Sequence, residues 1–235
     1  MKPLVIFGLG VVADVAYQHF KRDGEFDIQA FTVDEAWLKD KSISERFFHG
    51  IPVVPFEIVE QAYDPASFGM FIAMGYHSLN TIRARKCKEA KAKGYTLASY
   101  ISPRAHIGPW LKIGENCLIL DGVGVQPGAL IGNNVSIWNN SLIGHHAIVE
   151  DDCWLAAGAT LGGLMKLGAG SFVGLNATLG GDIKIGASSF IGGGTVVLKS
   201  AEAKSVFIQP TTEKFRLNSE EFLRITRMSS IGSRK

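Results

Sequence analysis

Two adjacent imidazoles, His145 and His146, follow Gly144 in the middle of the sequence. An imidazole can take up a proton near neutral pH, so it suits the general base that a nucleophile needs in a group-transfer reaction. The acidic residues 150–152 come shortly afterwards and could orient the base. His146 could also be the base itself, or both side chains could be exposed without a role. We take His145 as the first candidate for the base and His146 as the second.

A glycine turn near the amino terminus offers a second kind of chemistry. The apolar run 3–7 precedes Gly8 and Gly10 and then an amphipathic stretch, which predicts a strand, a tight turn and a helix. Backbone N–H groups at a helix start bind phosphate. Asp34, after a second strand predicted at 28–33, could accept from a ribose hydroxyl or a base. The alternative is that the glycines only form the turn and that Asp34 caps a loop.

The rest of the first hundred residues predicts a small α/β domain with a parallel sheet. Gly75 and Tyr76 follow another apolar strand at 70–74, and a helix is predicted at 80–93. Six Lys and Arg residues of this helix are interpreted as a solvated face. About 100 residues are too few for a full six-stranded dinucleotide domain, so an oxidoreductase is the least favoured function.

The elements that must position the two imidazoles follow from a repeat. Every sixth residue from Ile101 to Val197 is aliphatic, and the residue after it is usually Gly. A period of six fits neither a helix nor one long strand. It predicts short strands joined by corners, three to a coil, with the aliphatic side chains pointing inward and stacked coils forming the core.

The amino-acid composition changes at the two ends of this repeat. Of the 27 Gly residues, 19 lie between 101 and 197, where only 10 of the 46 charged residues are found. We therefore predict a domain at 1–100, a second at 101–208 and a tail at 209–235. The tail should hold a short helix at 219–228, capped by Asn218 or Ser219, that packs on the end of the prism or on a neighbouring molecule.

Several classes of protein are excluded or disfavoured. The 24 basic and 22 acidic residues leave no strong positive excess, so we expect no nucleic acid partner. The three Cys lack metal-type spacing, and no signal peptide or 18-residue apolar run appears, so we expect a cytoplasmic protein without membrane insertion. Zinc would need three converging imidazoles. His106 lies about two coils from the adjacent pair, so no metal is predicted.

Residues 101–197 resemble the hexapeptide-repeat acyltransferases, which implies a left-handed parallel β-helix and trimers with acyl-CoA bound between neighbouring prisms. With the amino-terminal domain added, the chain to about residue 208 resembles the sugar acyltransferases that modify nucleotide-linked amino sugars or sialic acid. The expected fold is an α/β Rossmann-like amino-terminal domain, then an all-β left-handed parallel β-helix, then a short carboxy-terminal helix.

The resemblance also implies roles for individual residues. It places the catalytic base at His145, and relatives often follow the base with a Glu, where this chain has His146. Residues expected to bind the nucleotide sugar are Gly8, Gly10, Asp34, Gly75, Tyr76, Asn139 and Asn140. Those expected to bind the acyl donor are Ala157, Gly162, Gly163, Gly174, Asn176, Ala177, Gly180, Gly193 and Lys199. The glycines could instead serve only the bends.

The expected function is an acetyl-CoA-dependent N-acetyltransferase acting on the amino group of a nucleotide-linked dideoxy amino sugar in bacterial surface glycan biosynthesis, such as lipopolysaccharide O-antigen. The expected assembly is a homotrimer. The alternatives are a sugar O-acetyltransferase of the sialic acid type and a non-catalytic nucleotide-binding β-helix protein.

Overall fold

The computed structural model describes residues 2–39, 41–42 and 46–228. Its amino-terminal part is a five-stranded sheet in the order β3-β4-β2-β1-β5, parallel except for the β3–β4 pair. The strands are β1 (Lys2–Phe7), β2 (Phe26–Val33), β3 (Phe47–Phe48), β4 (Ile51–Pro55) and β5 (Gly69–Ile72). The helices are α1 (Val11–Asp23), α2 (Val59–Ala62) and α3 (Thr81–Ala92), with 3-10 turns η1 (Glu35–Trp37) and η3 (Phe56–Ile58).

The local sequence explains the first strand and helix. The last four residues of β1 are buried, as expected for a strand in a parallel sheet covered on both faces. Helix α1 buries Ala13, Ala16 and Phe20 at helical spacing. It ends at Gly24, whose φ of 68° is the left-handed conformation that closes many helices.

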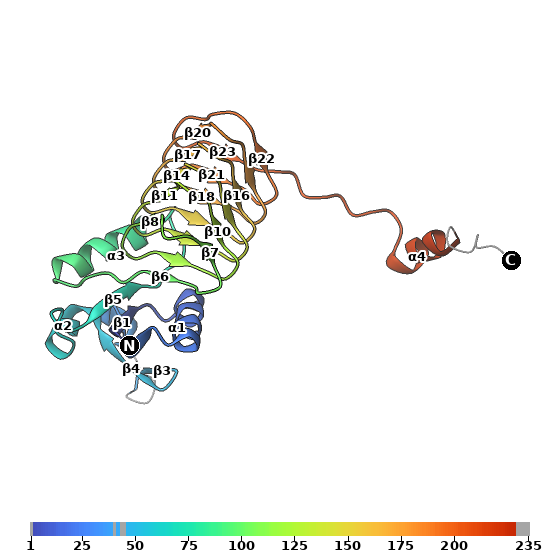
Figure 1. The fold of residues 1–235 in the computed structure, drawn as a ribbon. Coiled ribbons are helices and arrows are strands. Elements are labelled where there is room, and N and C mark those ends of the chain that lie inside the picture. Colours follow the sequence, from blue (N-terminus) through green and yellow to red (C-terminus); the bar gives the residue numbers. More distant parts are fainter. Residues whose placement is uncertain (1, 40, 43–45, 229–235) are drawn as a thin grey trace.

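The second part is a triangular prism of two-residue strands that stands on the sheet domain (Figure 1). Its seven-stranded face contains β6 (Tyr100–Ile101), β9 (Leu118–Ile119), β12 (Ser136–Ile137), β15 (Trp154–Leu155), β18 (Phe172–Val173), β21 (Phe190–Ile191) and β23 (Val206–Phe207). The six-stranded face contains β7 (His106–Ile107), β10 (Gly124–Val125), β13 (Leu142–Ile143), β16 (Thr160–Leu161), β19 (Thr178–Leu179) and β22 (Val196–Val197). The five-stranded face contains β8 (Lys112–Ile113), β11 (Leu130–Ile131), β14 (Ile148–Val149), β17 (Lys166–Leu167) and β20 (Lys184–Ile185).

The six-residue repeat is confirmed residue by residue. Each aliphatic position from Ile101 to Val197 is the second residue of one of the strands β6 to β22, and these side chains form one continuous core. All strand pairs in the prism are parallel, for example β12 with β15. The fold class is therefore as expected: an α/β domain, a parallel β-helix of the left-handed type and a short carboxy-terminal helix.

We name the three edges of the prism by the turns that form them. The histidine edge consists of the turns after the strands of the six-stranded face, and it carries His145 and His146. The asparagine edge consists of the turns after the seven-stranded face, and it carries Asn139 and Asn140. The docking edge consists of the turns after the five-stranded face.

The sequence pattern indicated that the repeat ends at Val197, but the structure continues it. Ala201 forms a bridge with Ile185, and β23 pairs with β21. Ala201 comes only four residues after Val197, so this turn is shorter than the six-residue repeat requires. A search at a fixed period of six loses the register at that point.

The tail helix α4 (Ser219–Met228) forms over the expected residues. Asn218 caps it, because the Glu221 N–H donates to Asn218 Oδ1 at 3.0 Å while Glu221 Oε2 accepts from the Asn218 N–H at 3.1 Å. The helix does not pack on the end of its own prism. It lies well away from the body of the molecule (Figure 1), and Phe222 and Leu223 are exposed. Packing on a neighbouring molecule stays a prediction.

The sheet domain and the prism share a hydrophobic core. Tyr100 and Leu118 on the seven-stranded face are buried in the cluster that contains Phe20 and Phe71 of the sheet domain. The rings of Phe20 and Tyr100 lie 5.0 Å apart. This contact fixes the seven-stranded face as the one that the sheet domain covers.

The interpretation of helix α3 as a solvated face is wrong for two of its basic residues. Arg83 is 1% exposed and Lys86 is 6% exposed. Arg83 faces the prism and Lys86 faces Asp34. Partners distant in the sequence satisfy their hydrogen-bonding groups, and the periodicity of the helix alone does not reveal those partners.

Candidate functional site

Three loops meet at one edge of the sheet, as parallel strands require. Gly8 follows β1, Asp34 follows β2 and Gly75 follows β5, with β1 in the middle of the three strands. This edge is where ligands bind in open α/β sheets. The structure therefore brings together Gly8, Gly10, Asp34, Gly75 and Tyr76.

The two turn glycines have different roles. Gly8 has φ of 118°, and a Cβ atom there would lie 2.7 Å from the carbonyl oxygen of Ala73, so packing alone requires glycine. Gly10 has open space around it and is the N-cap of α1, without a side-chain cap. Val11, the first helical residue, is 81% exposed. The helix start is thus open to a ligand, as an anion site needs.

Asp34 is held by a buried lysine. Lys86 Nζ lies 2.6 Å from Asp34 Oδ1 and 2.6 Å from Glu89 Oε2. Burial opposes the charge on Lys86, but the two carboxylates outweigh it and raise the pKa of the ammonium. Asp34 precedes η1 but makes no side-chain cap. The structure therefore gives no support to the capping role, and it leaves Asp34 half-exposed at the sheet edge.

Tyr76 lies against an aromatic wall on the seven-stranded face. Its ring is 4.4 Å from Phe172 and 5.4 Å from Trp154. Val12 of α1 and Trp138 pack on the same cluster, and the buried Trp138 Nε1 has no hydrogen-bond partner. We did not predict this wall from the sequence, although outward-facing aromatics at 154, 172 and 190 recur every third strand. Asn139 and Asn140 follow Trp138 directly, in the same turn of the asparagine edge.

His145 and His146 occupy the histidine edge, and both are exposed. Their Nδ1 atoms are 3.4 Å apart, and the ring planes are 77° apart. The Nε2 atom of His145 lies over Gly163 of the next coil, where a Cβ atom would be only 2.4 Å away. Gly163 thus leaves room for the His145 ring against the backbone of the next coil, and the imidazole is exposed to solvent.

The three acidic residues considered as orienting groups have other partners. Glu150 lies 2.5 Å from Lys166 Nζ and accepts from the Ala169 N–H. Asp151 accepts from the Asn133 N–H, and Asp152 accepts from Asn134 Nδ2. Among the described residues, the side chain that lies within hydrogen-bonding distance of the His145 ring is that of His146.

The residues expected to bind the acyl donor divide between two edges. Gly162, Gly163, Gly180 and Lys199 share the histidine edge with the imidazoles, whereas Ala157, Gly174, Asn176, Ala177 and Gly193 lie on the asparagine edge. The six-stranded face separates the two groups within one chain.

Ala177, Gly162 and Gly174 also have structural roles. Ala177 is 0% exposed and belongs to the core, so its side chain has a packing role. Gly162 and Gly174 are required by coil stacking, because a Cβ atom would lie 2.4 and 2.5 Å from the backbone nitrogen of the next coil. The same clash occurs at Gly168 on the docking edge, so glycine at this position does not by itself indicate a ligand.

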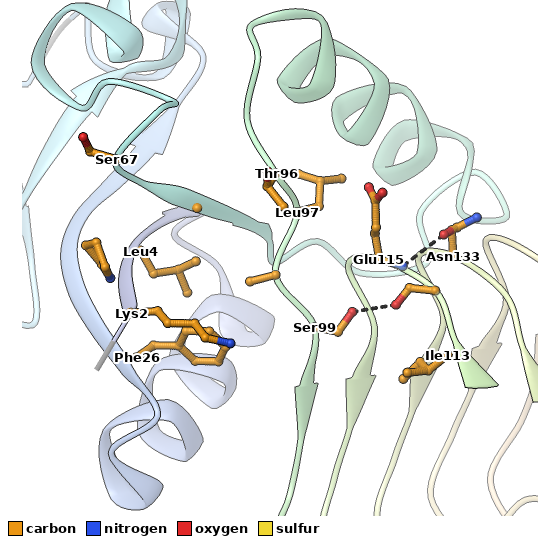
Figure 2. A pocket seen from close by; sticks show the side chains of 14 residues that line it. Lys2, Leu4, Phe26, Ser67, Thr96, Leu97, Ser99, Ile113, Glu115 and Asn133 are labelled. Carbon is orange, nitrogen blue, oxygen red and sulfur yellow. Dashed lines mark hydrogen bonds between the residues drawn. The ribbon is translucent and has the colours of Figure 1, made fainter. Parts of the chain in front are cut away.

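A pocket of about 720 Å³ opens elsewhere, between the amino ends of β1 and β5 and the lower coils (Figure 2). None of the predicted site residues lines it. Ser99 Oγ donates to the Gly114 carbonyl at 2.8 Å, and Asn133 Oδ1 accepts from the Glu115 N–H at 3.0 Å. Both hydrogen bonds lie within the prism side of the pocket (Figure 2), and we assign the pocket no role.

Within residues 2–39, 41–42 and 46–228, no cluster of three His, Cys, Asp or Glu side chains has the arrangement of a metal site. In the same ranges no helix combines the length and apolar character that a membrane span requires.

Comparison with known proteins agrees with the architecture. The family model described as bacterial transferase hexapeptide (six repeats) matches residues 111–145 and 128–163. The serine acetyltransferases of Bacillus subtilis and Bacillus licheniformis are 32% and 31% identical in alignments 130 positions long that cover 47% of this chain. The chain spans 60% of the length of these curated relatives.

Two solved structures match nearly the whole chain. A perosamine N-acetyltransferase from Caulobacter crescentus, a His-to-Asn variant in complex with CoA and GDP-perosamine, is 24% identical with a TM-score of 0.77 over 88% of this chain and 93% of that one. The acetyltransferase domain of PglB from Neisseria gonorrhoeae is 22% identical with a TM-score of 0.73 over 85% and 93%. This chain therefore carries the bacterial transferase hexapeptide repeat and has the two-part fold of these two acetyltransferases.

Proposed function

We propose that this protein is an acetyl-CoA-dependent acetyltransferase that acts on the amino group of a nucleotide-linked amino sugar, with His145 as the general base. The observation that carries the proposal is the position of His145 Nε2 over the bare backbone of Gly163. The prism that holds it has the fold of proteins solved with CoA, acetyl-CoA or GDP-perosamine.

The chemistry is a direct transfer. The amine nitrogen attacks the thioester carbonyl carbon, and its proton passes to His145 Nε2. The tetrahedral intermediate then expels the CoA thiolate, which takes the proton to leave as the free thiol. Backbone N–H groups beside the histidine edge would stabilise the oxyanion.

The nucleotide would bind at the sheet edge. Its phosphates would meet the open start of α1 at Gly10, and Asp34 would accept from the ribose or base. The sugar would lie along Tyr76 towards Asn139 and Asn140. CoA would follow the histidine edge, where Gly163, Gly181 and Lys199 succeed His145 coil by coil.

The position of the sheet domain supports a site shared between two subunits. The sheet domain covers the seven-stranded face, whereas the histidine edge joins the other two faces and lies opposite. Within one chain the sheet domain and His145 therefore lie on different sides of the prism. A homotrimer, in which the histidine edge of one subunit approaches the sheet domain of the next, would complete the site.

Release of CoA thiol tests the activity. Acetyl-CoA would be combined with a panel of nucleotide amino sugars, a sialic acid and L-serine, the last because of the match to serine acetyltransferases. We expect turnover with a nucleotide amino sugar and a product that resists hydroxylamine, as an amide does and an ester does not. Turnover with sialic acid or L-serine alone would replace the proposed acceptor. No turnover despite nucleotide binding would favour the non-catalytic alternative.

His145→Ala tests the base. We expect kcat to fall about 10²- to 10⁴-fold. His106→Ala is the matched control, because His106 is also exposed and belongs to the six-stranded face but lies far down the prism. A His145→Ala variant with wild-type kcat would refute the assignment of the base.

A further inference from the structure

In the hydrogen bond between the two imidazoles, one ring must be the donor and the other the acceptor. The Nδ1 atoms of His145 and His146 are 3.4 Å apart. Two ring nitrogens can form a hydrogen bond only if one carries the hydrogen and the other offers a lone pair. One of the two rings therefore donates and the other accepts.

The proposed role of His145 Nε2 as the proton acceptor determines which ring donates. The Nε2 atom of His145 lies over Gly163, and a base must offer a lone pair at that atom. A neutral His145 then carries its hydrogen on Nδ1. His146 must accept at its own Nδ1, so its hydrogen is on Nε2.

His146 is held in place by the coil below it. Its N–H donates to the Pro127 carbonyl at 3.0 Å, and its φ is 57°. Its ring lies over Gly128, where a Cβ atom would be 2.6 Å from His146 Cδ2. A glycine thus leaves room for the second imidazole, as Gly163 does for the first.

We propose that His146 is the positioning residue for His145, replacing the carboxylate that a general base often has as its partner. This inference rests on the proposed function of the same site. His146 fixes His145 in the tautomer with a free Nε2 and accepts from its Nδ1–H. When His145 takes the proton from the attacking amine, the hydrogen bond continues and stabilises the imidazolium.

The first test separates orientation from binding. His146→Phe keeps an aromatic ring over Gly128 but offers no lone pair, and we expect kcat to fall about 10- to 100-fold with both KM values changed less than about twofold. His146→Glu restores an acceptor and should recover most of the rate. If His146→Phe keeps wild-type kcat while His145→Ala does not, the inference is refuted and the proposed function stands.

A pair of glycine variants tests the placement of the ring. Gly128→Ala and Gly170→Ala carry the same backbone strain, because their φ values are 76° and 69°. Only the Gly128 methyl group would meet the His146 ring, whereas the atom nearest to a Cβ of Gly170 is 3.6 Å away. We expect Gly128→Ala to lower kcat further than Gly170→Ala at equal thermal stability. Equal kcat values in the two variants would contradict the role of His146.

A third test does not depend on turnover. The ¹⁵N chemical shifts of the histidine rings show which nitrogen carries the hydrogen, and the His145→Ala and His146→Phe variants assign the two signals. We expect the hydrogen on Nδ1 of His145 and on Nε2 of His146. The opposite tautomers would overturn the inference even in a protein for which no acceptor is found.

Discussion

Arg83 donates from Nε to Oδ1 of Asn134 at 2.9 Å, although 51 residues separate them. Its Nη2 donates to the carbonyl oxygens of Asn134 and Cys153, and the guanidinium lies 5.4 Å from the ring of Trp154. Asn134 in turn donates to Asp152 on the next coil. Helix α3 is thus fastened to the docking edge, and this holds the Gly75–Tyr76 loop against the aromatic wall.

Loss of this contact should loosen the two domains. Burial lowers the pKa of Arg83 to about 10, and Arg83→Ala would leave buried partners without a donor. We expect a loss of more than about 2 kcal/mol in the free energy of unfolding, measured with urea. Arg85→Ala, at an exposed position of the same helix, should change it by less than about 0.5 kcal/mol. Equal losses in the two variants would show that the buried contact is unimportant.

Acid should destabilise the protein through a second contact between the domains. Arg22 binds both Asp23 and Asp121, and this pairing lowers the pKa of Asp121 to about 2 and holds that of Asp23 well below its usual range. Because the folded pKa values are depressed, the stabilisation is complete above about pH 4 and is lost as pH falls towards 2. We expect the Tm to fall steeply over that interval.

Asp121→Asn should lower the Tm at pH 7 and make the fall between pH 4 and pH 2 shallower, as followed by circular dichroism. Asp27→Asn is the control, since Asp27 accepts from a glutamine rather than an arginine. An Asp121→Asn variant whose acid transition matches that of the wild type would refute the contribution of this ion pair.

Asp34→Asn should raise the KM for the nucleotide sugar about 10-fold or more, with little effect on the KM for acetyl-CoA, because the carboxylate stands at the sheet edge where we propose that the nucleotide binds. Glu89→Gln is a matched control: Glu89 lies at the same 2.6 Å from Lys86 Nζ but is on helix α3. If both substitutions raise this KM equally, the ion pair matters and Asp34 does not contact the nucleotide.

The three thiols should be unreactive in the native protein. Cys87, Cys117 and Cys153 are buried, and burial raises the pKa of Cys117 to about 11 and those of Cys87 and Cys153 to about 12. We expect Ellman's reagent to modify none of them at pH 8 within minutes and all three after unfolding in guanidinium. Rapid modification of the native protein would show that the core around Arg83 opens readily.

The sequence by itself determined the prism and the place of the two imidazoles in one of its turns. Each inward residue of the repeat, such as Ile137 or Leu155, makes the same contact with the coils above and below. A contact that recurs every six residues leaves a period that can be read without knowledge of the fold. The tail helix was also readable, since Asn218 and Glu221 cap each other within one turn.

Only the tertiary structure decided which groups meet. Arg83 and Lys86 look like exposed helix residues in the sequence, yet Asn134 and Asp34, 51 and 52 residues distant, make them interior. The acidic run after the imidazoles looked suited to orient His145, but its carboxylates bind other partners, while His146 makes the contact. The physical reason is that a side chain's partner depends on which coil lies above or below it and on which face the sheet domain covers, and no local pattern records that choice.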